Sequence, residues 1–132
     1  MRTLKFSIIF FIIQSAFYLN AAIHIVTSSE DCHPDSLSYY PGTLRSIIHF
    51  AESGDTITFA PDIYQVNLNL INNDNQIIFR KDITIDGGND KVIFDLPASS
   101  RYGNHNFFLI GINLDTIFVT INNIIFKNLN SV

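Results

Sequence analysis

One short amphipathic helix leads directly into a series of strands, and this join constrains the fold more than any other feature of the chain. Between Leu44 and Ala51, apolar residues recur with the spacing that lines one face of a helix. Thr43 can cap the start, and Gly54 can adopt the left-handed conformation that ends a helix. We predict an amphipathic helix over about 43–53. Such a short helix is marginal alone, so its apolar face must pack on the strands that come after it.

After this helix the chain consists of short runs rich in Ile, Val and Phe, separated by turn-forming residues. These runs predict strands at 56–59, 66–71, 76–79, 83–86, 92–96, 107–112 and 118–126. No second helical pattern lies between them, so alternating β-α units are not expected. Apolar and polar residues alternate in 66–70 and 119–122, which predicts one buried and one exposed face. The sequence therefore predicts an all-β protein: a sandwich, a barrel or a β-helix.

Three strand segments resemble one another, namely Ile57-Thr58-Phe59, Ile83-Thr84-Ile85-Asp86 and Val119-Thr120-Ile121-Asn122. Their first residues are separated by 26 and 36 residues, from 57 to 83 and from 83 to 119. These intervals are close to the length of one coil of a β-helix, with a loop at 97–106 inserted in the second. The repeat therefore favours a parallel β-helix over a sandwich.

Four motifs stand out between residues 26 and 88: VTSSED (26–31), TLRSII (43–48), SGDTITF (53–59) and DITIDG (82–87). Together they resemble the amino-terminal region of bacterial right-handed parallel β-helix surface proteins, which carry a CSLREA-type motif followed by a G-D-T-I strand. In this chain Gly42 and Thr43 precede Leu44, Ser46 replaces the acid, and Cys32 lies upstream. The resemblance implies a pectin-lyase-like fold in an exported adhesin or autotransporter passenger, and sometimes a glycan-cleaving enzyme.

The amino-terminal residues have the composition of a secretory signal peptide. Arg2 and Lys5 precede a mostly apolar run at 6–17, and Asn20-Ala21-Ala22 supplies small residues where a signal peptidase could cut. The run is shorter than the roughly 20 apolar residues of a membrane-spanning helix, so an uncleaved anchor is the less favoured interpretation. We predict that 1–22 are removed, that the mature chain is secreted or at the cell surface, and that it does not insert into a membrane.

The predicted organisation is a signal peptide at 1–22, an N-terminal cap at 23–55 and the first coils of a β-helix at 56–132. The last predicted strands carry apolar residues such as Ile121 and Phe126, and the sequence stops without a C-terminal cap. We therefore expect an incomplete β-helix of two to three coils, with an uncapped C-terminal coil through which copies could self-associate.

The charge of the chain argues against a nucleic-acid partner. The whole chain has 8 Lys and Arg residues and 12 Asp and Glu residues, for a formal net charge of −4. Loss of Arg2 and Lys5 with the signal peptide leaves 6 basic and 12 acidic residues, a net charge of −6. Such a surface repels the phosphates of nucleic acids and of anionic lipids. A glycan or a host-surface molecule is the partner that the resemblance implies.

Single candidate residues have mainly structural interpretations. Asp31 and Cys32 lie in a short polar cluster with His33 and Asp35, but zinc and calcium sites need further ligands at defined spacing, so we interpret it as a capping loop. Cys32 is the one cysteine of the chain, and we expect a buried thiol rather than a bond to another chain. No metal or cofactor is therefore expected.

The charged residues around the helix are also interpreted as structural. We expect Asp55 to accept nearby backbone N–H groups in a turn rather than to act as a catalytic acid. We expect Arg45 to pair with Glu52 or Asp55. The histidines, His24 and His49 among them, have no evident carboxylate or nucleophile partner at a recognisable spacing.

Two groups of polar residues, a set of aspartates and a set of asparagines, have interpretations beyond a simple structural role. Acidic residues recur near predicted strand ends at Asp82, Asp86, Asp90 and Asp95. Stacked with a nearby Lys or Arg, they would favour the alternative of a pectin-lyase-like lyase or glycoside hydrolase. Side-chain amides could form a ladder at coil corners, or be solvated, at Asn122, Asn123, Asn128 and Asn130. We predict a structural or binding module without catalysis of its own, with no catalytic residues assigned; a non-functional remnant of a longer surface protein is a third hypothesis.

Overall fold

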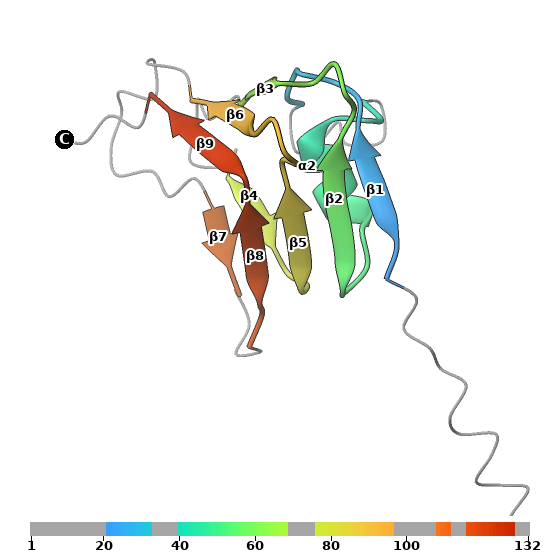
Figure 1. Cartoon of the computed structure of the whole chain (residues 1–132). Helices are drawn as coiled ribbons and strands as arrows, with labels where there is room; N and C mark the ends of the chain where they lie inside the picture. Colours follow the sequence, from blue (N-terminus) through green and yellow to red (C-terminus); the bar gives the residue numbers. More distant parts are fainter. Residues whose placement is uncertain (1–20, 33–39, 69–75, 97–107, 112–115, 129–132) are drawn as a thin grey trace, which may run out of the picture.

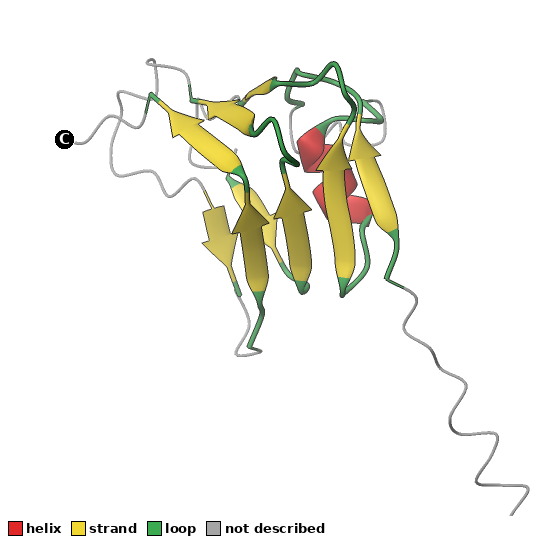
Figure 2. Ribbon diagram, viewed as in Figure 1, coloured by secondary structure: helices red, strands yellow, loops and turns green. Residues whose placement is uncertain are grey.

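The computed structural model describes residues 21–32, 40–68, 76–96, 108–111 and 116–128, and within these ranges the chain forms three sheets and one helix (Figure 1 and Figure 2). The first sheet contains β1 (Ile23–Val26), β2 (Asp55–Phe59), β5 (Ile83–Asp86) and β8 (Val119–Asn122). The second contains β3 (Gln65–Asn67), β6 (Val92–Asp95) and β9 (Ile124–Lys127). The third contains β4 (Ile77–Phe79) and β7 (Phe108–Ile110), and the helix α2 spans Leu44–Phe50.

The chain passes through the three sheets in a repeated order. Strands β2, β3 and β4 lie in the first, second and third sheets, β5, β6 and β7 follow in the same order, and β8 and β9 lie in the first and second. All neighbouring strands of the three sheets are parallel. The prediction of an all-β chain with one short helix is confirmed, and these strand pairs do not fit a sandwich, whose sheets are antiparallel.

Several predicted strands lie within one residue of the observed bounds, namely those at 56–59, 76–79, 83–86 and 92–96. The predicted run 118–126 is divided between β8 and β9 by Asn123, whose φ of 56° turns the chain from the first sheet to the second. Asparagine enters this left-handed region more readily than most residues. Strand β1 is not predicted by the pattern of apolar runs, because its four residues include His24. The predicted loop insertion at 97–106 lies outside the described residues.

The register of the first sheet confirms one of the two predicted alignments. Ile83 lies opposite Val119, as predicted, but the residue of β2 opposite Ile83 is Asp55 rather than Ile57. The predicted alignment of β2 with β5 is therefore shifted by two residues from the observed register. Because side chains alternate between faces with a period of two, a shift by two leaves the same residues facing inward, and the apolar pattern cannot detect it.

Helix α2 begins where the sequence predicts and ends earlier. Thr43 is the N-cap, and its hydroxyl oxygen accepts a hydrogen bond of 3.3 Å from the backbone nitrogen of Ser46. The helix ends at Phe50, and Ala51 already has an extended backbone. Gly54, with a φ of 92°, forms the turn into β2 instead of ending the helix.

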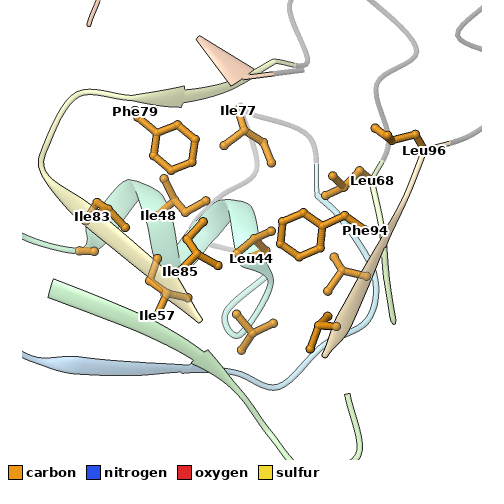
Figure 3. Packing of buried hydrophobic residues seen from close by; sticks show 14 residues of the cluster. Leu44, Ile48, Ile57, Leu68, Ile77, Phe79, Ile83, Ile85, Phe94 and Leu96 are labelled. Atoms are coloured by element: carbon orange, nitrogen blue, oxygen red, sulfur yellow. The ribbon is translucent and has the colours of Figure 1, made fainter. Parts of the chain in front are cut away.

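A single apolar cluster fills the space between the three sheets and α2. Figure 3 shows that Ile57, Ile85, Phe79 and Phe94, which come from four different strands, gather in the same core as Leu44 of the helix. All five side chains are buried. The alternation of buried and exposed residues in β2, β5 and β6 follows the pleat, as the sequence predicts. Burial of α2 against the strands explains how so short a helix is stable.

Five phenylalanine rings form a continuous chain of edge-to-face contacts through this cluster. The ring of Phe94 contacts those of Phe59 and Phe126, with centroid distances of 6.0 and 5.7 Å. The ring of Phe108 contacts Phe126 at 5.8 Å and Phe79 at 5.4 Å. This is a favourable geometry for aromatic pairs. The rings link all three sheets, which gives these five of the twelve phenylalanines a structural role.

Candidate functional site

A cavity of about 450 Å³ lies between α2 and β4. Its volume is within the usual range for small-ligand pockets. The apolar part of its lining consists of Ile48, Ile77, Ile78, Phe79 and Ile83. The polar part consists of Arg45, His49, Gln76, Arg80 and Lys81. The sequence alone does not reveal this site, because its residues come from a helix and a strand whose juxtaposition depends on the tertiary fold.

The cavity is basic in a chain that is acidic as a whole. Arg80 is exposed at its border, and His49 is exposed on α2. The ammonium group of Lys81 donates to the backbone oxygen of Ala51 and lies 3.8 Å from the carboxylate of Glu52. Among the described residues, no aspartate or glutamate lines the cavity. Because Lys81 lies beside Glu52, Arg80 is the main source of positive charge at the cavity, and it favours an anionic group over a cationic one.

Arg45 forms part of the cavity wall but is held by a buried ion pair. Its Nε and Nη2 atoms donate to the two carboxylate oxygens of Asp31 at 2.9 and 2.7 Å. The side chains are 6% and 1% exposed, and Nη1 donates to the backbone oxygen of Gln76 at 2.9 Å. The prediction that Arg45 pairs with Glu52 or Asp55 is wrong. Arg45 lies on the buried side of the helix and faces the segment after β1, which contains Asp31.

The polar segment at Asp31 and Cys32 has a capping role in the described part of the chain. Cys32 is buried, as predicted, and its sulfur lies 3.2 Å from the hydroxyl of Thr43. The backbone nitrogen of Cys32 donates to Asp31 at 2.8 Å. The other predicted members of this cluster, His33 and Asp35, lie outside the described residues. Among the described residues, no group of three or more acidic, histidine or cysteine side chains is placed to hold a metal ion.

Asp55 is a buried carboxylate that organises the start of β2. Oδ1 accepts from the backbone nitrogen of Ala22 at 2.8 Å, and Oδ2 accepts from that of Glu52 at 2.8 Å. Oδ2 also lies 2.6 Å from Nε2 of His24. The hydrogen bonds from Ala22, Glu52 and His24 lower the pKa of Asp55 to about 2. The predicted turn role is confirmed, whereas the expectation that His24 has no carboxylate partner is wrong.

The acidic residues near strand ends are held by separate structural contacts. Asp82 accepts from the backbone nitrogen of Phe118 at 2.8 Å. Asp86 accepts from the Asn123 amide at 3.0 Å and from the backbone nitrogen of Gly88 at 3.0 Å, and these bonds lower its pKa. Asp90 is exposed in the turn before β6. These acids therefore do not converge on one group of reacting atoms.

Asp95 is the centre of a polar ladder on the outer side of the second sheet. Its carboxylate accepts from the side-chain amides of Gln65 and Asn128, and lies 3.7 Å from the ammonium group of Lys127. The predicted asparagine contacts between neighbouring strands are thus present at Asn123 and Asn128, but their partners are aspartates rather than other amides. Asn122 is exposed, and Asn130 and His105 lie outside the described residues.

Comparisons of this chain with protein-family models, with curated proteins and with solved structures found no match. Within the ranges that the structure describes, no helix is both long enough and apolar enough to span a membrane. A function for this chain therefore has to be inferred from its fold and from the contacts within it.

Proposed function

We propose that this chain forms the N-terminal cap and first coils of a right-handed parallel β-helix in an exported surface protein, and that it is a structural and binding module without catalysis of its own. The repeated order of the three sheets supports the β-helix, because one passage through the sheets corresponds to one coil. Parallel crossovers are almost always right-handed, which supports the handedness. The resemblance of the four sequence motifs supports the same assignment.

In this proposal α2 is the cap of the first coil. It lies beside the β1–β2 end of the first sheet (Figure 2) and contributes Leu44 and Ile48 to the core. A helix at this position covers apolar residues that would otherwise be exposed. The composition of the first residues supports export through a signal peptide.

The basic cavity between α2 and β4 is the observation that carries the proposed binding activity. We assign it to the carboxylate of an acidic sugar in a glycan. Arg80 and Lys81 supply positive charge at the border, and Ile78 of the lining, which is 36% exposed, can contact the face of a sugar ring. Binding is preferred to hydrolysis because no carboxylate lines the cavity among the described residues, and hydrolysis of a glycoside generally uses a pair of them.

Isothermal titration calorimetry with a uronic-acid oligosaccharide tests this proposal, with a neutral oligosaccharide of the same length as the reference. We expect the acidic sugar to bind more tightly and its affinity to fall as salt rises. Replacing both Arg80 and Lys81 by glutamine should weaken binding about tenfold or more. The matched control is Lys91→Gln, an exposed cation outside the cavity. Equal binding of the two sugars, or an equal effect of the control, would contradict the proposal.

A further inference from the structure

The backbone nitrogen of Ala22 lies against a buried carboxylate at the region where we propose that the signal peptide is cut. It is 2.8 Å from Oδ1 of Asp55, a residue that is only 3% exposed. The backbone oxygen of Ala22 accepts a hydrogen bond of 2.9 Å from the nitrogen of Thr56. Ala22 is thus held on β2 through both of its backbone polar groups, while Ala21 and Ala22 remain exposed.

These two bonds restrict where processing can occur without loss of structure. Removal of residues 1–22 would delete the donor to Asp55 and the acceptor for Thr56. A buried polar group that loses its hydrogen-bond partner destabilises the folded state, so a mature chain that keeps Ala22 should be more stable than one that lacks it. A signal peptidase requires a small residue before the cut, and Ala21 meets this requirement.

We propose that processing cuts the peptide bond between Ala21 and Ala22, and that the new α-ammonium group of Ala22 forms an ion pair with the buried carboxylate of Asp55. In this hydrolysis a water molecule adds across the bond. The C–N bond breaks, Ala21 retains a carboxylate, and the nitrogen of Ala22 becomes an amine that takes up a proton. The inference rests on the proposed export, and it places the cut one residue earlier than the composition alone suggests.

The surroundings of Asp55 suit a cation at Oδ1. His24 of β1 occupies Oδ2, so the ammonium group at Oδ1 would not displace it. The other charged side chains near this turn are Glu52, which is exposed, and Lys81, which lies 3.8 Å from Glu52. Asp82 is also close, because its backbone oxygen accepts from Gly54 at 2.7 Å. The three donors to Asp55 therefore come from β1, from the residue before it and from the turn after α2.

The ion pair would make the stability of the exported protein depend on pH in the alkaline range. An opposite charge at hydrogen-bond distance favours the protonated amine, so the pKa of the α-amino group should rise by about one unit or more above its ordinary value of about 7.7–8.0. A group whose pKa is raised on folding stabilises the folded state below its unfolded pKa. That stabilisation is lost as the pH rises through the higher, folded pKa.

The test begins with the full chain expressed in an export-competent bacterium, followed by intact-mass analysis of the exported product. We expect a product that begins at Ala22. The pKa of its α-amino group is then measured by the pH dependence of acetylation, in native buffer and in denaturant. We expect the native value to be higher by about one unit, which corresponds to about tenfold slower acetylation near neutral pH.

Asp55→Asn should abolish this protection, whereas Asp62→Asn, which removes a charge from an exposed turn, should not. If Asp55→Asn does not fold, the comparison of native and denatured wild-type protein still decides the matter. An exported product that begins at another residue, or a native α-amino pKa equal to the denatured one, would overturn the ion pair and leave export intact. A chain that is exported or retained without any cut would overturn the proposed signal peptide, and the ion pair with it.

Discussion

Loss of the guanidinium group of Arg45 should destabilise the fold more than loss of any exposed cation. Arg45→Met removes two charge-assisted hydrogen bonds to Asp31, at 2.9 and 2.7 Å, and one to the backbone of Gln76. It also removes the cation from beside the carboxylate of Asp31, whose side chain is 1% exposed. Breaking a buried ion pair in this way costs about 3–5 kcal/mol. That is a large part of the roughly 5–15 kcal/mol that stabilises a typical domain.

Urea denaturation followed by far-UV circular dichroism measures this cost. The control is Arg80→Met, which removes an exposed cation and should change the free energy of unfolding by less than about 0.5 kcal/mol. Asp31→Asn and the double variant complete a cycle, in which the double variant should cost clearly less than the sum of the two single ones. A cost for Arg45→Met below about 1 kcal/mol, or strictly additive effects, would refute the reasoning.

Five further substitutions, two of them controls, test other parts of the same structure. Phe94→Ala should cost about 3–5 kcal/mol because its ring is fully buried, whereas Tyr64→Ala, at an exposed position, should cost under about 0.5 kcal/mol in the same denaturation assay. Gly87→Ala should destabilise the fold, because a Cβ at Gly87 would lie 2.2 Å from a backbone oxygen of the β8–β9 corner, whereas a Cβ at Gly88 meets nothing and the cost of Gly88→Ala comes from its φ of 70°. Asp55→Asn should reduce the loss of stability on acidification, which acid titration would show.

The sign of the acid effect is set by the pKa of Asp55, which folding lowers from 3.8 to about 2. A carboxylate with a depressed pKa stabilises the folded state above its unfolded pKa, and this contribution is lost as the pH falls from about 4 to about 2. An Asp55→Asn variant with an unchanged acid transition would contradict the contribution of this residue. A Gly87→Ala variant as stable as the unmodified protein would likewise contradict the close approach of the backbones at Gly87.

The sequence predicts most local structure, because capping and strand formation depend on neighbouring residues. Thr43 as the N-cap and the turn role of Asp55 are both confirmed. Contacts between distant segments are harder to predict. The pairing of His24 with Asp55 depends on β1 lying in register with β2, and four residues carry too weak a pattern to reveal that strand. The same limit applies to the pairing of Arg45 with Asp31.

The candidate site could not be predicted for a related reason. Arg80 and Lys81 come after an ordinary apolar strand, and His49 lies on the polar side of a short helix, so neither segment suggests a binding site by itself. The cavity is formed where α2 lies beside β4. In the described part of the third sheet, β4 pairs with β7. That arrangement is a property of the three-sheet order, which the sequence indicates only through weak repeats.

The central claim is that the strands stack in parallel with the observed register, and nuclear Overhauser measurements on the protein test it most directly. We expect backbone contacts between Ile57 and Ile85, between Ile85 and Ile121, and between Phe94 and Phe126, in the staggered pattern of parallel strands. Close contacts between directly opposed α-protons are typical of antiparallel strands. If such contacts linked these segments, the strands would be antiparallel, as in a sandwich or a barrel, and the parallel stacking would be wrong.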